Sequence, residues 1–425
     1  VDENDRDLTN HLSYLALEAA DRINISCNLT VRVHENCDPA FLEKAVYYLF
    51  KNKNGWPRFC DDKNLCDGYR KNGVDKKTAR QRIAVGCNWM CVPGREFPMN
   101  DTVKVNFAKV LEEALKEMKT EKEPSTERLF ALFQKHLLCA VDTVAKGVNL
   151  HLDHIHEVTP ELIMNLMFHH CLEKGLDASQ CAELFTVGVD GAALAVVADS
   201  FGAMEERIER ENRLSWQQLY EALENNFADE RLRLMLQSTP KYCGGGTAAD
   251  AWAKRISALW TEIVANQKMP AGRKLVPGLF SWARSIEYGQ AVGATPNGRR
   301  KGEPISHGAN PNPHFRVDGA VTALSSGIAG VQCGRGNTAP LQLEFDPQME
   351  EGGVQLVLEL IKTHFRLGGT LININILDGE KLLQAHKNPE QYPDLVVRVT
   401  GFTAYFASLS PEFRQLVVNR FLTGI

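Results

Sequence analysis

The sequence predicts an α/β fold, and three of its features support that prediction. Segments with the helical repeat of apolar residues alternate along the chain with short β-branched runs, such as the one from Thr370 to Leu377. No long linker, internal repeat or low-complexity tract interrupts this alternation. The composition, 44% apolar and 24% charged over 425 residues, is that of a globular protein with a sizeable core.

The first part of the chain is predicted to alternate helices with a short strand. Helices are expected over residues 12–25, 38–50, 100–118 and 126–147, and a strand over residues 29–33. Residues 78–87 end a further helix and bring Cys87 to a glycine-marked turn or strand start. Asn100 or Asp101 is expected to cap the helix that follows.

The middle of the chain is predicted to be mostly helical, and the last part returns to alternating elements. Helices are expected over residues 160–174, 190–210, 215–226 and 249–267. A zone of loops rich in glycine and proline follows over residues 270–340. The chain then predicts helices over residues 348–366 and 378–387 and strands over residues 370–377 and 395–399.

Charge and hydropathy exclude several classes of function. The formal net charge is −5 and basic residues are scattered, so we expect no nucleic-acid partner and no anionic membrane surface as a partner. No stretch approaches 18 apolar residues, the length that a membrane-spanning helix requires. The opening residues Val1 to Asp5 are acidic and polar, unlike a secretory leader, and a cytoplasmic location is expected.

The cysteines and histidines do not predict a metal site. The 11 cysteines are odd in number and lack the tight repeated pairs of zinc or iron–sulfur sites, so free thiols in a reducing compartment are expected. His151, His154 and His156, followed by His169 and His170, do not have the spacing of a zinc protease helix. We expect these histidines on a helix or loop surface, and no metal.

Gly401 lies between two strand-like runs, Leu395 to Thr400 and Phe402 to Phe406. Considered alone, it is typical of a bulge or tight turn between strands. The stretch Tyr392-Pro-Asp-Leu-Val-Val-Arg-Val-Thr-Gly-Phe-Thr-Ala-Tyr-Phe406, however, closely resembles the signature of the glycyl radical enzymes, the pyruvate formate-lyase superfamily. Blocks from Val187 to Ser200 and from Gly293 to Pro304 also resemble that family, so the similarity runs in order from about Leu29 to the C-terminus.

This resemblance implies a fold and a stored radical. It implies the C-terminal half of a ten-stranded α/β barrel, with residues 1–300 as the second half of the catalytic barrel and residues 301–425 as a C-terminal glycine radical domain. Gly401 would carry a backbone radical, which suits glycine because a side chain would crowd the planar centre. A separate radical-SAM activating enzyme would install the radical after translation, and no other cofactor is expected to be bound.

The resemblance also identifies a cysteine. The stretch Ala84-Val-Gly-Cys-Asn-Trp-Met-Cys91 matches the loop on which the family places the cysteine that becomes a thiyl radical, and Cys87 occupies that position. Cys91 is the alternative thiyl residue. For either cysteine, the other interpretation is a buried, unreactive thiol.

The chain departs from the family in two respects. The family has a large N-terminal half of the barrel before this point, so we expect either a missing segment or a second chain, besides the homodimer that the resemblance implies. Many dehydratases of the family carry a glutamate where this chain has Trp89. Trp89 would be either a core aromatic residue or a wall of the substrate pocket. Glu96 is the nearest carboxylate that could act as acid or base, unless it is a surface charge beside Arg95.

The functional prediction is a radical-dependent lyase that cleaves a C–C or C–heteroatom bond of a small organic molecule. Trp89 and the segment Gly368 to Leu377 favour decarboxylation of an arylacetate. Acyl transfer of the formate-lyase type would need coenzyme A and a second reactive cysteine, whereas Asn88 follows Cys87 here. A dehydratase, a fumarate-adding synthase and an inactive truncated homologue are the remaining alternatives.

Overall fold

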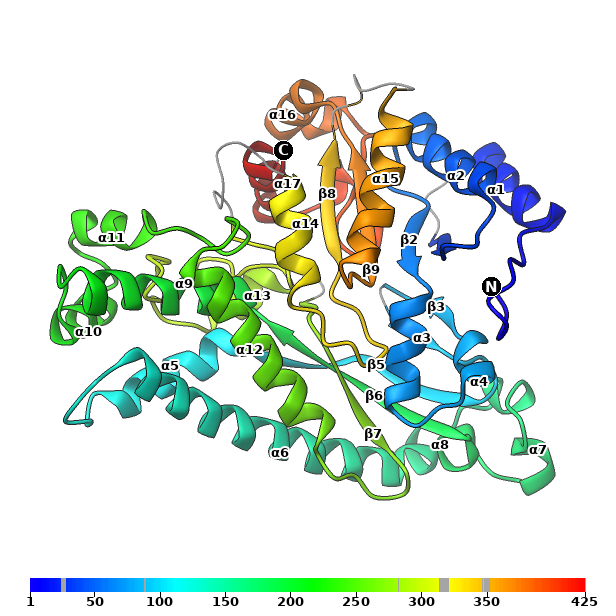
Figure 1. Cartoon of the computed structure of the whole chain (residues 1–425), viewed down its shortest axis with the longest axis horizontal. Helices are drawn as coiled ribbons and strands as arrows, with labels where there is room; N and C mark the ends of the chain where they lie inside the picture. The colour runs from blue at the N-terminus through cyan, green and yellow to red at the C-terminus, as the bar shows by residue number, and fades with distance from the viewer. Residues whose placement is uncertain are drawn as a thin grey trace.

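The computed structural model describes residues 1–23, 28–87, 89–281, 283–312, 321–345, 347 and 352–424. Within these residues the strands form a four-stranded sheet, a three-stranded sheet and two hairpins, and helices surround them (Figure 1). The α/β fold class predicted from the sequence is confirmed. The division into residues 1–300 and 301–425 stays a prediction.

The four-stranded sheet contains two parallel pairs of strands that run in opposite directions. Its order is β1 (Thr30–Val33), β2 (Arg58–Asp61), β9 (Leu371–Ile376) and β8 (Leu341–Phe345). β1 and β2 are parallel, β8 and β9 are parallel, and β2 meets β9 in antiparallel register. The helices α14 (Val321–Ala329) and α15 (Gly352–Arg366) lie along β8 and β9 (Figure 1). Every residue of β2, β8 and β9 is buried, as expected for strands that are covered on both faces.

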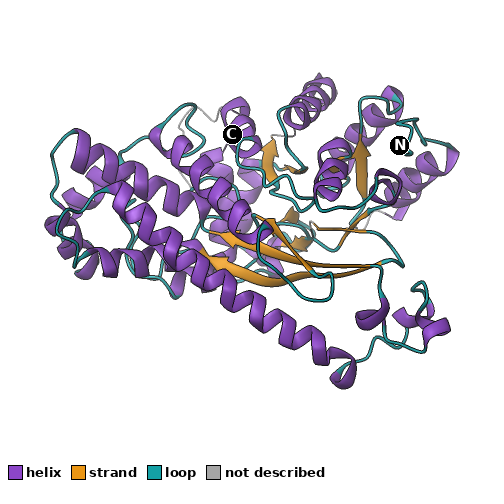
Figure 2. Ribbon diagram, turned by 60° about the horizontal axis from the view of Figure 1, so that its bottom comes forward, coloured by secondary structure: helices purple, strands orange, loops and turns teal. Residues whose placement is uncertain are grey.

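The three-stranded sheet is entirely parallel. It consists of β5 (Glu96–Asn106), β6 (Leu184–Ala192) and β7 (Lys274–Gly278), in that order. The helices α5 (Phe107–Met118), α6 (Thr126–Val158), α9 (Leu194–Met204) and α12 (Ala248–Ala265) pack on it, and Figure 2 shows the longest of them running beside the strands. Gly191 must be a glycine here, because a Cβ would lie 2.1 Å from the Phe107 ring.

Two further hairpins carry the residues singled out from the sequence. The first is β3 (Ile83–Val85) and β4 (Trp89–Cys91), which we call the cysteine hairpin. The second is β10 (Val396–Arg398) and β11 (Thr403–Tyr405), which we call the glycine hairpin. The remaining helical segments are α1 (His11–Ile23), α2 (Pro39–Asn52), α3 (Lys63–Lys71), α4 (Lys76–Arg80), η1 (Met164–Leu166), α7 (Cys171–Lys174), α8 (Ala178–Cys181), η2 (Glu205–Arg210), α10 (Trp216–Glu224), α11 (Glu230–Gln237), α13 (Ser285–Gln290), α16 (Gly379–Lys387), η4 (Pro389–Gln391), η5 (Phe406–Ser408) and α17 (Pro411–Gly424).

The predicted helix over residues 100–118 is wrong in its first part. Strand β5 continues to Asn106, and α5 begins at Phe107. Asn106 is the N-cap, since its side chain accepts from the backbone N–H groups of Ala108 and Lys109. Asn100 and Asp101 therefore cap no helix and lie within β5, at an irregularity in its pairing with β6.

Other predicted elements changed in extent or type. Residues 190–192 of the helix expected over residues 190–210 form the end of β6. The loop zone expected over residues 270–340 contains β7, α13 and α14. Strand β8 was not predicted, and most of residues 160–174 lies in turns and the short η1 and α7. The ends of two predicted helices, residues 24–25 and 348–351, lie outside the described residues.

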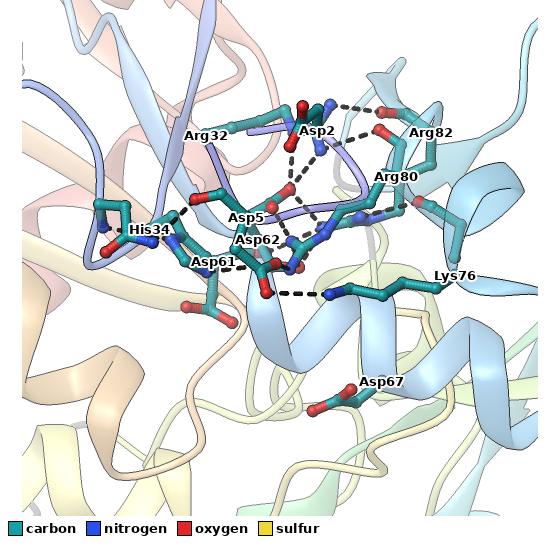
Figure 3. Close-up of polar contacts among 12 residues, drawn as sticks. Asp2, Asp5, Arg32, His34, Asp61, Asp62, Asp67, Lys76, Arg80 and Arg82 are labelled. Carbon is teal, nitrogen blue, oxygen red and sulfur yellow. Dashed lines mark hydrogen bonds and ion pairs between the residues drawn. The ribbon is translucent and has the colours of Figure 1, made fainter. Parts of the chain in front are cut away.

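A cluster of buried charges anchors the root of the cysteine hairpin, and we call it the Asp62 cluster (Figure 3). Its members are Asp62, Arg32, Arg80, Arg82 and Asp5. The Asp62 carboxylate is fully buried and pairs with all three arginines, with 3.0 Å between Oδ1 and Nη2 of Arg82. Arg80 also pairs with Asp5 at 2.5 Å. Since residues 80–82 lead directly into β3, these contacts fix the point from which the cysteine hairpin projects.

We predict that Asp62→Asn destabilises the protein by about 3–5 kcal/mol, because removing one partner leaves buried guanidinium groups without their counter-charge. Asp67→Asn is the matched control: Asp67 lies half-exposed on α3 and pairs with Arg70 at 3.6 Å, so its removal should change stability by about 0.5 kcal/mol or less. Urea unfolding of both variants measures the difference.

The pH dependence of the same comparison is a second check. Burial acts to raise the pKa of Asp62, but Arg82, Arg32 and Arg80 outweigh it and hold the pKa below its usual range. The stabilisation should therefore be present above the unfolded pKa of roughly 4 and be lost as pH falls through the folded value. Equal unfolding curves for Asp62→Asn and Asp67→Asn at neutral pH would contradict the assignment.

Candidate active site

The cysteine hairpin presents Cys87 at its tip. Val85 and Trp89 are register partners, so residues 86–88 make the connection between the two strands. Gly86 has a φ of +50°, in the left-handed region, and an added Cβ would meet nothing nearer than 4.0 Å. Glycine is therefore needed at Gly86 for backbone conformation rather than for space.

The glycine hairpin presents Gly401 in the same way. Arg398 and Thr403 are register partners, and the N–H of Val399 donates to the carbonyl of Phe402 at 3.0 Å across the four-residue tip. The φ of Gly401 lies outside the left-handed region. The tight turn that a lone strand glycine predicts is present, but backbone conformation does not account for the residue type.

Close approach to Cys87 accounts for it. A Cβ on Gly401 would lie 2.3 Å from Cβ, 2.5 Å from Cα and 2.7 Å from the carbonyl carbon of Cys87. Adding a bond of about 1.5 Å places the Cα of Gly401 within about 4 Å of the Cβ of Cys87. The two tips, from opposite ends of the sequence, are thus in direct contact, and no side chain fits between them.

Arg398 holds the tip that carries Gly401. Its fully buried guanidinium donates from Nη2 to the carbonyl of Gly401 at 2.8 Å and from Nε to the carbonyl of Thr400 at 3.0 Å. The backbone of Arg398 exchanges two hydrogen bonds with the Asn375 side chain of β9, at 2.6 Å and 3.0 Å. The carbonyl over which a Gly401 radical would delocalise is therefore held by a charged donor.

The thiol of Cys87 is half-buried among four charged side chains. Burial raises its pKa, Asp101 raises it further, and Arg58, Arg398 and Lys104 act to lower it. The net shift is upward, so the neutral S–H form is favoured near neutral pH. That form suits exchange of a hydrogen atom better than nucleophilic attack, which requires the thiolate.

The structure does not bring Cys91 to Gly401. Cys91 is the register partner of Ile83 at the base of the cysteine hairpin, two register pairs below the Val85 and Trp89 pair that closes the tip with Cys87. Its thiol is buried, and burial and the charge of Glu96 raise its pKa to about 12. The environment of Cys91 is that of an unreactive core cysteine.

Glu96 is buried, so the alternative of a surface charge beside Arg95 is wrong. Its carboxyl accepts hydrogen bonds from the Tyr69 hydroxyl at 3.1 Å, from the backbone N–H of Val92 at 2.7 Å and from the Thr186 hydroxyl. Glu96 begins β5 and influences the thiol of Cys91 rather than that of Cys87. The contacts of Glu96 are those of a structural carboxyl group, and an acid–base role for it stays a prediction.

Trp89 is buried two residues from Cys87 and lies against both a ring and a charge. Its ring meets Phe280 edge to face at 5.1 Å between centroids, and the Nζ of Lys104 lies 5.0 Å from its centroid. Phe280 in turn packs edge to face on His307 at 5.5 Å. Trp89 thus packs the base of the hairpin tip, and this position is compatible with a pocket wall as well.

A salt bridge that the sequence did not predict lies across the end of the parallel sheet. Lys104 of β5, Asp190 of β6 and Gly278 of β7 are successive register partners. The Nζ of Lys104 lies 3.0 Å from Oδ2 of Asp190, and Nδ2 of Asn337 donates to Oδ1 at 3.1 Å. Gly278 leaves room for this contact, because a Cβ would lie 2.3 Å from Oδ1 of Asp190. The carboxyl ends of parallel strands are where α/β folds bind ligands.

Asp101 joins this pair from an irregular point of β5. The pairing with β6 shifts between Met99 and Val103, and Asp101 has a φ of +64°, which is uncommon for a residue with a side chain. Its Oδ1 lies 2.6 Å from the Nζ of Lys104, and its side chain is 29% exposed, whereas that of Asp190 is fully buried. Bulges and strained residues of this kind occur preferentially beside active sites.

The pKa values of this group reflect its burial. Burial raises the pKa of Asp190 to about 6, even though Lys104 acts to lower it. The pKa of Lys104 is raised, because the carboxylates of Asp190 and Asp101 outweigh the opposing effect of burial. The sequence carried a weak signal for both acids: Asp190 lies in the block Val187 to Ser200, and Asp101 interrupts the alternation of a strand.

The described residues contain no group of three or more His, Cys, Asp and Glu side chains that could hold a metal ion. His151, His154, His169 and His170 are exposed. Within the same residues, no helix combines the length and the apolar character needed to cross a membrane.

Two protein-family models match most of the chain. The family model described as pyruvate formate lyase-like matches residues 1–289, and the model described as glycine radical matches residues 305–407. The chain belongs to the pyruvate formate lyase-like family. The family resemblance inferred from the sequence is confirmed.

Relatives of this family member include enzymes of different activities. Isethionate sulfite-lyase from Nitratidesulfovibrio vulgaris is 26% identical, over 98% of this chain and 53% of the relative. Trans-4-hydroxy-L-proline dehydratase from Clostridioides difficile is 26% identical, over 99% of this chain and 55% of the relative. The glycyl radical subunit of 4-hydroxyphenylacetate decarboxylase from Clostridioides difficile is 23% identical, over 69% of this chain and 36% of the relative.

Solved structures show the same fold. A glycyl radical enzyme from Archaeoglobus fulgidus matches with a TM-score of 0.92 and 28% identity, over 100% of this chain and 56% of that one. The glycerol-bound glycerol dehydratase from Clostridium butyricum matches with a TM-score of 0.91 and 25% identity, over 98% and 55% of the two chains. The chain therefore spans about half the length of the family members that it matches.

The charges around Cys87 make a prediction about its thiol. Asp101→Asn should lower the pKa of Cys87 and Lys104→Met should raise it, because the two side chains act on the thiol with opposite sign. Asparagine also tolerates the positive φ of Asp101, so the backbone need not change. The pH dependence of iodoacetamide labelling at Cys87, followed by peptide mass spectrometry, measures both shifts.

Asp142→Asn is the control for this experiment, because it removes an exposed carboxylate that pairs with Lys146 at 2.6 Å on α6. It should leave the labelling midpoint of Cys87 unchanged. If Asp101→Asn also leaves the labelling midpoint of Cys87 unchanged, Asp101 is not beside Cys87.

Proposed function

We propose that the chain carries the reaction centre of a glycyl radical lyase, which breaks a C–heteroatom bond of a small hydroxyl-bearing molecule. The contact between Gly401 and Cys87 supports this proposal most directly, since the Cα of the glycine and the thiol-bearing residue have no atoms between them. Gly401 stores the radical and Cys87 becomes the thiyl. A radical-SAM activating enzyme installs the radical on Gly401.

The reaction follows from these roles. The Cys87 thiyl takes a hydrogen atom from the carbon that bears the substrate hydroxyl, so an S–H bond forms as a C–H bond breaks. A carboxylate accepts the hydroxyl proton, and the leaving group departs from the neighbouring carbon with the electron pair of the broken bond. The product radical takes the hydrogen atom back from Cys87, which restores the thiyl.

Asp101 is the carboxylate that we assign to the proton transfer. It is more exposed than Asp190, it acts on the thiol of Cys87, and Lys104 fixes its position at 2.6 Å. Asp190 and Asn337 hold Lys104 and its salt bridge in turn. This group supplies the acid–base function that Trp89 cannot supply.

The relatives favour C–heteroatom cleavage over the arylacetate decarboxylation expected from the sequence. Those that match along nearly the whole chain include a sulfite-lyase and a dehydratase, both named for elimination reactions. The decarboxylase subunit matches over 69% of the chain. Acyl transfer is not favoured, because Cys91 lies at the base of the hairpin and leaves Cys87 without a second cysteine among the described residues of the tip.

A further proposal concerns the part of the barrel that this chain does not contain. Because the chain spans about half the length of its relatives, we propose that a further segment or a second chain completes the barrel around Cys87 and Gly401. The homodimer that the family resemblance implies stays a prediction.

The full-length protein, activated under anaerobic conditions, should show the doublet of a glycyl radical in electron paramagnetic resonance. Gly401→Ala should abolish the signal, whereas Gly147→Ala, at an open position on α6 with nothing within 4 Å of the added Cβ, should retain it. Cys87→Ala should retain the doublet and lose turnover, which separates storage of the radical from its use.

Turnover is measured with isethionate, trans-4-hydroxy-L-proline, propane-1,2-diol, glycerol and 4-hydroxyphenylacetate. Asp101→Asn should keep the doublet and lower elimination roughly 10²–10⁴-fold, the usual contribution of general acid–base catalysis. An undiminished doublet in Gly401→Ala would refute the radical assignment. Formation of 4-methylphenol from 4-hydroxyphenylacetate, without elimination from the other compounds, would restore the decarboxylase.

A further inference from the structure

Arg58 is a buried cation without a counter-charge. It begins β2 and is 1% exposed. Its Nε donates to the hydroxyl of Thr30 at 2.6 Å, but Nη1 is buried and has no hydrogen-bond partner. No carboxylate among the described residues forms an ion pair with it.

Nε of Arg80 and Nε of Arg82 also lack a partner, but the terminal nitrogens of these buried arginines have acceptors, unlike Nη1 of Arg58. Arg80 and Arg82 pair with the carboxylate of Asp62, and Arg398 donates to the carbonyls of Thr400 and Gly401. Burial lowers the pKa of Arg58, yet an arginine side chain stays protonated in proteins. A buried charge is normally paired or fully hydrogen-bonded, so this guanidinium lacks the acceptor that a buried cation normally has.

The register of β2 links Arg58 to the reaction centre. Side chains alternate along β2, and Phe59 packs into the main hydrophobic core, so Arg58 and Cys60 lie on the opposite face. In the antiparallel pairing of β2 with β9, Phe59 is the register partner of Ile372, so Arg58 lies opposite Asn373. The side chain of Asn373 accepts from Nη2 of Arg398, the residue that holds the carbonyl of Gly401 against Cys87. The unpaired donor and the reactive cysteine therefore belong to one site.

The remaining charges of the site form two groups with different binding properties. Asp101, Lys104 and Asp190 form a closed group in which one ammonium faces two carboxylates, so that group does not attract an anion. Arg58 is cationic and has unused donors. A guanidinium presents its donors in a planar fork that matches the oxygens of a carboxylate or sulfonate.

We propose that Arg58 binds an anionic group of the substrate, a carboxylate or a sulfonate, beside Cys87. The substrate is then a small hydroxylated acid anion rather than a neutral diol, with its anionic end on Arg58 and its hydroxyl end toward Asp101. The identity of this molecule as a substrate rests on the proposed lyase function, but its binding requires no radical. Binding can therefore be tested in protein that has not been activated.

The first test compares two alkylating reagents at Cys87 of the full-length, unactivated protein. Iodoacetate is a small carboxylate and iodoacetamide is its neutral analogue, and both react with the thiolate. Their rate ratio thus cancels any change in the pKa of Cys87. In the wild type the ratio should exceed that at the exposed Cys139, and Arg58→Gln should lower it about tenfold, the loss expected for a charged hydrogen bond.

Two further variants make the result specific. Arg58→Lys keeps the charge and should retain part of the preference for iodoacetate. Arg70→Gln removes a half-exposed arginine of α3 and should leave the ratio at its wild-type value. A wild-type ratio at Cys87 no higher than at Cys139, or one that Arg58→Gln leaves unchanged, would overturn the proposal.

The second test uses only the wild type, so it does not depend on the folding of a variant. Lactate and propane-1,2-diol share a carbon skeleton, but lactate carries a carboxylate where the diol carries a hydroxymethyl group. Isethionate is a hydroxylated molecule that carries a sulfonate instead. At matched ionic strength, lactate and isethionate should slow the reaction of iodoacetamide with Cys87 more than propane-1,2-diol does. Equal protection by the anions and the diol would overturn the proposal.

These outcomes are separable from those of the lyase experiment. If the anions protect Cys87 but the activated enzyme eliminates nothing from the compounds tried, the anion site stands and the proposed reaction fails. If elimination occurs only from propane-1,2-diol or glycerol, the lyase function stands and the role of Arg58 is refuted.

Discussion

The approach of one backbone to another at Gly401 is the constraint on which the rest of the site depends. A Cβ at this position would overlap three atoms of Cys87, so the contact exists only with glycine. Each of the two residues is carried by the tip of a two-stranded hairpin, and the two hairpins converge from segments more than 300 residues apart in the sequence. Under the proposed function, transfer of a hydrogen atom between Gly401 and the Cys87 thiol requires this convergence.

Each hairpin is held at its root by buried polar groups. Residues 80–82, which lead into the cysteine hairpin, are fixed by the Asp62 cluster, and the glycine hairpin is fixed by Arg398 and Asn375. Such groups are costly to bury unless every partner is in place. They therefore favour one position of each tip. The other charged side chains of the site lie on two different sheets. Asp101, Lys104 and Asp190 lie on the parallel three-stranded sheet, and Arg58 lies on β2 of the four-stranded sheet.

Local patterns in the sequence predicted the class of fold, and the resemblance of the surrounding motifs to the glycyl radical enzymes identified Gly401 and Cys87, which the structure places in contact. The β-branched runs around Gly401 and the glycine before Cys87 can be recognised in the sequence alone. The salt bridge between Lys104 and Asp190 could not be predicted from the sequence. Lys104 and Asp190 are 86 residues apart and become neighbours only through the register of two parallel strands. Asp101 was mistaken for a helix cap, since an acid after Asn100 and before an amphipathic run is also typical of a helix start.

Glu96 shows that closeness in sequence does not determine the contacts of a side chain. Proximity in sequence to Cys87 suggested an acid–base role, but β5 begins there and directs its carboxyl into contacts with Tyr69, Val92 and Thr186. Arg58 was missed because its significance lies in a missing partner, and burial of an unpaired donor is a property of the folded chain alone. Strand β7, in the glycine-rich zone, and β8, directly after it, were missed because short buried strands lack the alternation that reveals a half-exposed strand.

The most direct test of the central claim is hydrogen exchange at the glycyl radical in deuterium oxide. If Cys87 and Gly401 pass a hydrogen atom between them, the deuterium of the Cys87 thiol enters the Cα of Gly401, and the doublet of the activated protein collapses toward a singlet. The account predicts this collapse in the wild type and its loss in Cys87→Ala. A doublet that persists in the wild type, or that collapses equally in Cys87→Ala, would contradict it.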